Sequence, residues 1–286
     1  MPAKRLGVRP GDIIAAIDGK STDDLTLDGA VAKLRGEKGT TVRITLEREK
    51  ESLDLVIERA EIPTESIQHA YMIRPDTGFI RIKDFTKTTT RELRDALASL
   101  RRQGMTKLIL DLRDNPGGLL EEAISVSSLF LEPGQLVVET RGRIEGSNEK
   151  RFAAVEGDRL SPSTPLIVLV NSGSASASEI VSGAVQDHDR GLIVGTTTWG
   201  KGLVQSVYSL SGDAGLALTT ARYYTPSGRQ IQRDYRSSYY DYLYGPRRGA
   251  PKGEGHATDS GRTVHSGGGV EPDVEVAETE IHSLVV

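Results

Sequence analysis

The chain has 286 residues, of which 37% are apolar and 27% charged, with a formal net charge of −4. This length allows one large and one small domain, and the charge balance gives no general attraction to nucleic acid or to an anionic membrane. The chain has no cysteine, which excludes disulfides, thiolate metal sites and a cysteine nucleophile.

The sequence contains neither a membrane-spanning nor a secretory pattern. No apolar run approaches the ~18–20 residues that cross a bilayer. Residues 1–5 lead straight into globular sequence and do not form a signal peptide. If the protein is exported, we expect its signal to lie upstream of this chain.

Residues 1–60 predict a small α+β unit. The Asp18-Gly19 dipeptide after an apolar run is a strong hairpin signal, and later residues alternate with period two, as in half-buried antiparallel strands. The predicted elements are a strand over 12–17, a helix over 25–34 with Leu27, Val31 and Leu34 on one face, and strands over 41–46 and 53–57. Residues 61–69 are the expected linker.

Residues 70–286 alternate predicted strands and helices, which favours an α/β core. The predicted elements are strands over 78–82, 107–113, 165–170, 191–195, 203–207 and 215–224, helices over 90–103 and 120–131, and an amphipathic helix after Ser178. Residues 234–262 are rich in Tyr, Gly and Arg without an apolar period, so a long mobile loop is expected there.

The stretch 171–180 is the most informative part of the chain. Small residues and hydroxyls at a strand-to-helix junction let backbone N–H groups and a side-chain oxygen face a substrate together. Ser176 is therefore a candidate nucleophile, provided that a base can reach it. The alternative is a helix cap, which Ser178 and Glu179 also fit. The cap alone does not explain why the turn lacks bulk around Ser176.

Lys201 is a candidate base, 25 positions after Ser176 and between two glycines. A lysine acts as a base only where burial lowers its pKa, because desolvation disfavours the charged form. Trp199 and Leu203 are apolar neighbours that can supply such burial, and Gln205 can hydrogen-bond a neutral amine. The alternatives are a solvated surface lysine and an ordinary glutamine on a strand.

Gly117 and Gly118 form a turn after the predicted strand 107–113. Ligands of α/β proteins bind at such strand ends, and two adjacent glycines can present bare N–H groups to a developing oxyanion. The same pair also fits a strand-to-helix turn that only needs a positive φ. The residues leave both interpretations open.

A histidine-based triad is not favoured. His188 lies 12 residues after Ser176, so the two would be roughly 18 Å apart on one helix. Asp187 fits a helix-end residue, with a supporting role at the site as a minor option. No cluster of His, Asp and Glu has metal-ligand spacing, so we expect no metal and no other cofactor.

These motifs resemble the active-site signature of the carboxyl-terminal processing (tail-specific) proteases, peptidase family S41. The similar segments are 110–119, 173–180, 198–202 with Gln205, 223–229 and 268–274, in the family's order and spacing. Trp199 stands where the family usually has phenylalanine. The first unit is similar to a PDZ domain, most typically over 9–14, but the chain starts after the strand and carboxylate-binding loop of such a domain. It therefore resembles a partial PDZ domain, for which peptide capture cannot be assumed.

The resemblance implies a crotonase-like α/β protease core over 70–286 and a small α+β partial PDZ domain over 1–60. It implies Ser176 as nucleophile, Lys201 as general base and Gln205 as the residue that orients the lysine. It also implies an oxyanion hole from the backbone of Ala177 and the Gly117/Gly118 turn. Asp187 falls where some family members have an aspartate of unsettled role.

The implied activity is that of a serine endopeptidase with a Ser–Lys dyad that cleaves proteins near their C-termini. Its action is expected in the periplasm or elsewhere outside the cytoplasm. The expected partners are protein or peptide substrates with apolar C-termini, with an adaptor or a homo-oligomer as options and no nucleic acid. The alternative is a non-catalytic peptide-binding protein of the same fold. A missing serine or lysine would have favoured it, and both are present.

Overall fold

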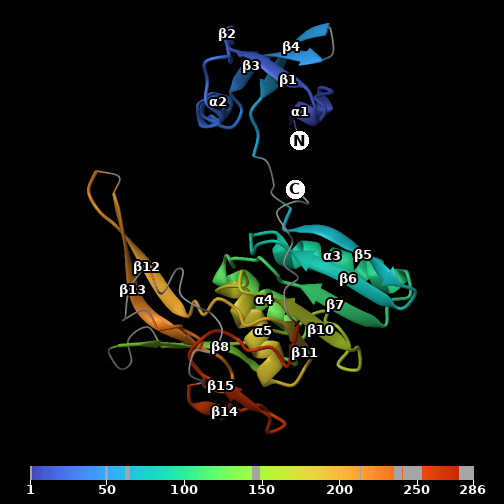
Figure 1. The fold of residues 1–286 in the computed structure, drawn as a ribbon, viewed down its shortest axis with the longest axis vertical. Helices are drawn as coiled ribbons and strands as arrows, with labels where there is room; N and C mark the ends of the chain where they lie inside the picture. The colour runs from blue at the N-terminus through green and yellow to red at the C-terminus, as the bar shows by residue number, and fades with distance from the viewer. Residues whose placement is uncertain are drawn as a thin grey trace. The chain divides into compact units, whose positions relative to one another are not determined.

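The computed structural model describes residues 2–48, 51–61, 65–143, 149–212, 214–234, 240 and 253–276. The chain divides into two units, Met1–Thr64 and Glu65–Val286, and each has its own hydrophobic core (Figure 1). None of the helices in these residues is long and apolar enough to cross a membrane.

The first unit contains one antiparallel sheet with the strand order β2-β1-β3-β4. Its elements are α1 (Pro2–Arg5), β1 (Ile13–Ile17), β2 (Lys20–Ser21), α2 (Leu27–Leu34), β3 (Thr41–Arg48) and β4 (Glu51–Glu58). Asp18 and Gly19 both have positive φ between β1 and β2, as the hairpin signal predicts.

Helix α2 differs from the prediction at its start and on its buried face. It begins after Thr26, whose side chain caps it by accepting a hydrogen bond from the Gly29 amide at 3.2 Å. Leu27 was expected on the buried face but is 82% exposed. Leu34 packs against the sheet as predicted, and Ala30 packs beside it.

The second unit is built on a six-stranded sheet with the order β16-β11-β10-β7-β6-β5. Its strands are β5 (Ile67–Arg74), β6 (Thr77–Ile82), β7 (Lys107–Asp111), β10 (Leu166–Val170), β11 (Leu192–Gly195) and β16 (Val274–Glu275). All neighbouring pairs are parallel except β5 and β6. Strand β5 begins inside the segment 61–69, so the prediction of a linker up to residue 69 is wrong.

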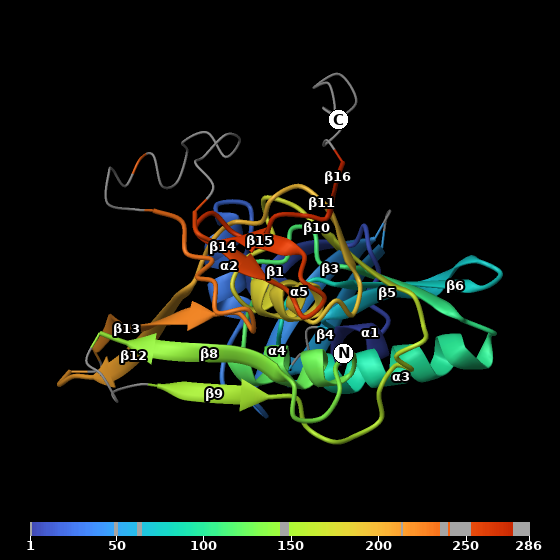
Figure 2. The same ribbon diagram turned by 90° about the horizontal axis from the view of Figure 1, so that it is seen from below.

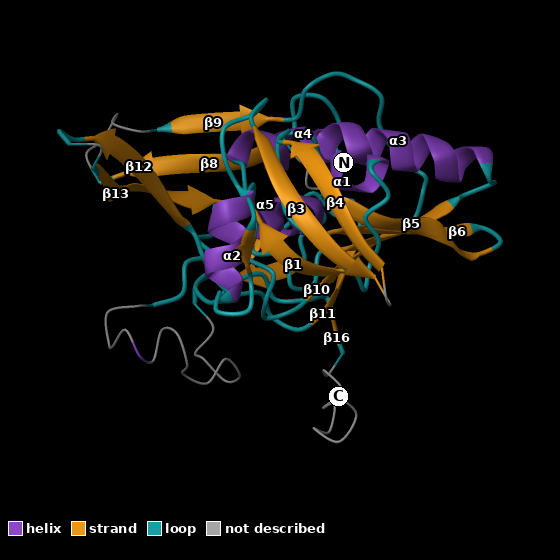
Figure 3. Ribbon diagram, turned by 90° about the horizontal axis from the view of Figure 1, so that it is seen from above, coloured by secondary structure: helices purple, strands orange, loops and turns teal. Residues whose placement is uncertain are grey.

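Three helices connect the strands of this sheet, namely α3 (Thr89–Arg102), α4 (Leu120–Ser128) and α5 (Ala177–Asp187). Figure 3 shows α3 lying along one face of the sheet. Strands and helices alternate along the chain here, as an α/β core requires. Every residue of α5 is buried, because α4, β8 and β11 pack around it (Figure 2). The prediction of an amphipathic helix is therefore wrong for α5.

A second sheet with the order β12-β13-β8-β9 extends from this core. Its strands are β8 (Leu136–Gly142), β9 (Lys150–Ala153), β12 (Leu203–Ser209) and β13 (Gly215–Tyr224). Figures 1 and 2 show β12 and β13 as a long hairpin that reaches away from the helices. Neither β8 nor β9 is among the strands predicted from the sequence.

The segment 234–262, for which a long mobile loop was expected, is described only in part. Residues 235–239 and 241–252 lie outside the described residues. Near its end the segment forms β14 (Gly255–Ala257), which pairs with β15 (Thr263–His265). A loop is therefore the wrong prediction for β14.

Candidate active site

Ser176 lies in the turn between β10 and α5, at the N-cap position of the helix. Its φ of 56° and ψ of −112° are in a region that residues other than glycine seldom adopt. Its amide donates to Glu179 Oε2 at 2.8 Å, and its carbonyl accepts from the Glu179 and Ile180 amides at 2.9 and 3.0 Å. Ser176 thus begins the helix and also holds a strained conformation of the kind that is concentrated at functional sites.

Gly117 packs directly against the Ser176 turn. Its φ is 100°, and an added Cβ would lie 2.7 Å from the Ala175 oxygen and 2.8 Å from Ser176 Cβ, so only glycine fits. Its amide donates to Asn115 Oδ1 at 2.9 Å and is therefore already engaged. Within the described part of the chain, neither the Gly118 amide nor the Ala177 amide has a hydrogen-bond acceptor.

Two asparagines hold the glycine turn and the serine turn together. Asn115 Nδ2 donates to the Ile82 carbonyl at 2.9 Å, and the Asn115 carbonyl accepts from the Ala175 amide at 2.9 Å. Asn171 Oδ1 accepts from the Asp114 amide at 2.9 Å, and Asn171 Nδ2 donates to Asp114 Oδ1 at 2.8 Å. Because β7 and β10 are parallel neighbours, both turns follow the same edge of the sheet.

Glu179 joins the serine turn to the loop that carries the candidate base. Its fully buried Oε2 accepts from the Ser176 amide at 2.8 Å and from the Lys201 amide at 2.9 Å. Its Oε1 accepts from the Thr198 hydroxyl at 2.6 Å and the Gly200 amide at 2.7 Å. Burial raises the pKa of Glu179, and these four hydrogen bonds act to lower it.

The sequence alone indicates Glu179 only as part of a helix cap. Its position three residues after Ser176 is the spacing of a capping box, a signal that could have singled it out. The other three donors, Thr198, Gly200 and Lys201, lie more than 18 residues further along the chain, a contact that local spacing cannot reveal.

Lys201 and Gln205 are not enclosed in the way that the sequence pattern predicts. Both residues are exposed, and no hydrogen bond between these described residues joins Lys201 to Ser176 or to Gln205. Trp199 was expected to shield the lysine, and its ring instead lies 5.1 Å below the guanidinium of Arg233. The structure brings the backbone amides of Ser176 and Lys201 onto one carboxylate, and no hydrogen bond joins their side chains among the described residues.

Asp187 and His188 lie at the opposite end of α5 from Ser176. Asp187 is buried and accepts from Arg229 Nη2 at 2.8 Å and from the Ser227 amide at 3.0 Å. His188 Nδ1 lies 2.7 Å from Asp259 Oδ2. These contacts fasten the end of the helix to the later part of the chain, and none of them involves a candidate catalytic residue.

The sequence of this chain is similar to those of known proteases. The sequence profile of peptidase family S41 matches residues 76–236, and that of a PDZ domain matches residues 1–48. The chain is 46% identical over 237 residues to the carboxy-terminal-processing protease of Bartonella bacilliformis. It is 40% identical over 246 residues to the carboxyl-terminal-processing protease of a Synechocystis species. Each alignment covers 81% of this chain and 54% of the relative, so the chain spans about half the length of these proteins.

Solved structures agree with these sequence matches. A photosystem II D1 C-terminal processing protease has a TM-score of 0.55 and 29% identity, and the match covers 96% of this chain and 65% of that one. A putative S41 protease from Bacteroides fragilis has a TM-score of 0.54 at 16% identity, over 97% of this chain and 68% of that one, and supports the fold alone. The S41 profile spans more than half of the chain, including the glycine turn, the serine turn and the lysine loop. The chain therefore belongs to peptidase family S41.

Proposed function

We propose that this protein is a serine endopeptidase that cleaves protein substrates near their C-termini. The observation that carries the proposal is the Glu179 carboxylate, which binds the Ser176 and Lys201 amides through one oxygen. This carboxylate holds the backbone of a candidate nucleophile next to the backbone of a candidate base in space. The relatives named as carboxy-terminal-processing proteases support the class of substrate.

In the proposed reaction Ser176 Oγ attacks the carbonyl carbon of the scissile peptide bond. Lys201 Nζ takes the serine proton and passes it to the leaving amine, and Gln205 orients the lysine. Water then attacks the acyl-enzyme and restores the serine. The Ala177 and Gly118 amides stabilise the oxyanion. Gly117 does not donate to the oxyanion, because its amide already donates to Asn115 Oδ1. Its role is to leave room for the serine turn, since it has no Cβ.

Completion of this dyad requires movement of the Lys201 side chain. Proton transfer needs the two heavy atoms within about 2.6–3.2 Å, whereas among the described residues no hydrogen bond joins the exposed Lys201 side chain to Ser176. Glu179 already fixes the backbone of both Ser176 and Lys201. We therefore infer that rotation of the lysine side chain within the Gly200–Gly202 loop brings Nζ to the serine.

We extend the proposal to the finer features of fold and setting. The core over 65–286 is proposed to be crotonase-like, and the first unit is proposed to be a PDZ-type domain. The profile match over residues 1–48 supports the second point. Action in the periplasm or elsewhere outside the cytoplasm remains part of the proposal.

The test is to incubate the purified chain with an unfolded protein and to map the cut sites by mass spectrometry. The proposal predicts new C-termini that lie close to the original one. Cleavage that requires added metal, or binding of the unfolded protein without any cleavage, contradicts it. The second result would point to a peptide-binding protein of the same fold.

A further inference from the structure

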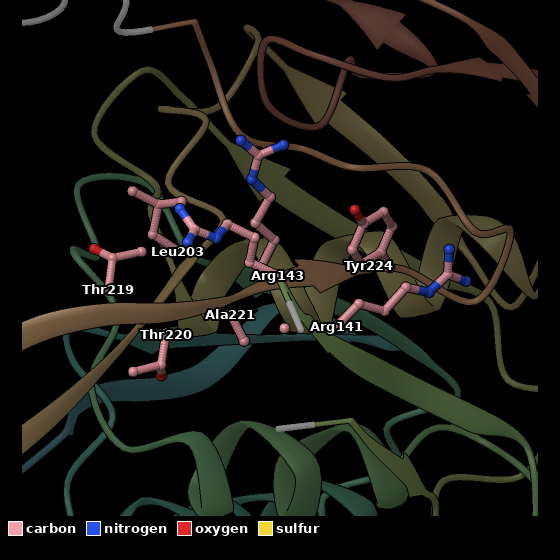
Figure 4. A pocket seen from close by; sticks show the side chains of 9 residues that line it. Arg141, Arg143, Leu203, Thr219, Thr220, Ala221 and Tyr224 are labelled. Carbon is pink, nitrogen blue, oxygen red and sulfur yellow. The ribbon is translucent and has the colours of Figure 1, made fainter. Parts of the chain in front are cut away.

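A cavity of about 380 Å³ opens on the second sheet, where β8, β12 and β13 meet (Figure 4). The register places Leu203 on β12 opposite Arg222 on β13, and Arg222 opposite Arg141 on β8. Directly opposed residues share one face of a sheet, as do residues two positions apart. Tyr224, two residues after Arg222 on β13, therefore lies on the same face as this row, and Arg143, one residue past the end of β8, also lines the cavity.

Positive charge collects in this cavity. Arg222 and Arg141 are directly opposed, an arrangement of like charges that destabilises a sheet. Arg141 is compensated by Glu139, with Nε 3.0 Å from Oε1, and its guanidinium lies 4.3 Å above the ring of Tyr224. Glu149 adds a second carboxylate near Arg141.

The other two arginines have no carboxylate partner within the described residues. Arg222 donates to the neutral amide oxygen of Gln230 at 3.3 Å. Arg143 makes neither an ion pair nor a hydrogen bond there. Figure 4 shows Arg143 between Tyr224 and Arg141 on one side and Leu203 and Thr219 on the other. Within the described ranges, the cavity thus presents two guanidinium groups without a carboxylate partner, in a hollow that a small anionic group can enter.

A carboxylate fits this cavity better than other anions that a peptidase meets. Guanidinium groups bind carboxylates through paired, charge-assisted hydrogen bonds. Leu203 and the Tyr224 ring offer apolar surface to the methylene groups of an acidic side chain, and Thr220 adds a hydroxyl. The net charge of −4 gives the chain no general attraction to nucleic acid.

The cavity also lies next to the proposed base. Leu203 follows Lys201 by two residues, which separates their Cα atoms by at most about 7 Å. A polypeptide whose scissile bond reaches Lys201 therefore passes the cavity within a few residues of that bond.

We propose that this cavity binds a carboxylate of the polypeptide substrate close to the bond that is cut. The carboxylate belongs either to an Asp or Glu side chain or to the C-terminus of the substrate. This inference rests on the proposed peptidase function, because it places a substrate at Lys201. It adds a preference for acidic groups to that function.

The test measures peptide binding to the full chain carrying Ser176→Ala, which prevents turnover. Four fluorescent peptides share one apolar sequence and differ in an internal Glu or Gln and in a free or amidated C-terminus. We expect one of the carboxylate-bearing forms to bind about tenfold tighter than the neutral peptide, a difference of ~1.4 kcal/mol. The internal and terminal changes identify which carboxylate is bound.

Substitutions then locate the preference. Arg143→Gln combined with Arg222→Gln is expected to abolish the tenfold difference, and circular dichroism checks that this variant remains folded. Arg94→Gln, on the exposed side of α3, serves as the matched control and should preserve the difference. Equal binding of all four peptides, an absence of binding, or a preference that survives the double substitution overturns the proposal.

Cleavage is measured separately on an unfolded protein with the unsubstituted chain. Cleavage without a carboxylate preference rejects the cavity and leaves the peptidase. A carboxylate preference that depends on Arg143 and Arg222, without cleavage, rejects the peptidase and leaves the cavity as an anion-binding site.

Discussion

Glu179 Oε2 lies 2.9 Å from the amide nitrogen of Lys201, which is 22 residues further along the chain. The same oxygen accepts from the amide of Ser176. A fully buried carboxylate with four donors can be removed only by leaving several of those donors without an acceptor. The spacing between the serine turn and the lysine loop therefore depends on this one side chain.

The first prediction concerns Glu179→Gln. Glutamine keeps one carbonyl oxygen and turns the other acceptor into an NH₂ donor, which then faces two donors. We expect a loss of about 1–3 kcal/mol in the free energy of unfolding and a fall of at least tenfold in the cleavage rate. Urea unfolding and proteolysis of an unfolded protein measure the two effects. Glu121→Gln, at an exposed position of α4, is the control and should behave as the unsubstituted chain does. A fully active and stable Glu179→Gln variant contradicts the linking role.

The second prediction is that Ser176→Ala abolishes cleavage and leaves the free energy of unfolding nearly unchanged, because only one oxygen is lost from the turn. Ser174 and Ser178 are unsuitable controls, since their buried hydroxyls donate to Leu112 and Asn115 carbonyls. The exposed Ser163 is a better one, and Ser163→Ala should retain full activity. Retention of activity by Ser176→Ala would falsify the nucleophile assignment.

The third prediction separates a base from a fixed positive charge at position 201. Lys201→Arg keeps the charge but cannot accept a proton, because guanidinium does not deprotonate near neutral pH. We expect Lys201→Arg and Lys201→Ala to be equally inactive, and the cleavage rate of the unsubstituted chain to rise with pH. Initial rates over a range of pH measure this. An active arginine variant would mean that the residue acts only as a cation.

The sequence predicts the position of Ser176 well because all the signals are local. An apolar strand, a turn of small residues and the first turn of a helix follow one another directly between 165 and 180. The adjacent glycines at 117 and 118 are likewise a local turn signal after a strand, and the structure gives them positive φ values of 100° and 149°. Both features could be named before any packing was known.

What surrounds these elements could not be predicted in the same way. The polar residues of α5 suggest an exposed face, but β8 and α4 cover it, and Ser182 satisfies its hydroxyl by donating to the Ser178 carbonyl at 2.8 Å. Glu179 acquires its second role only when the loop before β12 folds back onto it. Neighbouring apolar residues did not determine the exposure of Lys201 either, because side-chain direction depends on packing that sequence spacing does not specify.

The fourth prediction concerns pH and the first unit. The Arg48 side chain and the Arg9 amide hydrogen-bond Asp12 and hold its pKa at about 2, below 3.8. A lowered pKa means that the ionised carboxylate stabilises the folded unit above pH 3.8, and that this stabilisation is lost as the pH falls through about 2. In an NMR titration of the full chain, Arg48→Gln should move the Asp12 pKa toward 3.8. Arg35→Gln, at an exposed position after α2, should not. An unmoved Asp12 titration in Arg48→Gln counts against this account.

The last prediction concerns Gly117→Ala. An added Cβ would lie 2.7 Å from the Ala175 oxygen and 2.8 Å from Ser176 Cβ, so the methyl group must displace the serine turn. Gly104 has a similar φ of 93° and nothing within 4 Å of an added Cβ, so Gly104→Ala carries the same backbone strain without the clash. We expect Gly104→Ala to lose about 1–3 kcal/mol of stability and to keep its activity per folded molecule. Gly117→Ala should lose more stability and most of its activity. Equal behaviour of the two variants would show that the turn needs only a positive φ, and that close contact with Ser176 plays no part in the chemistry.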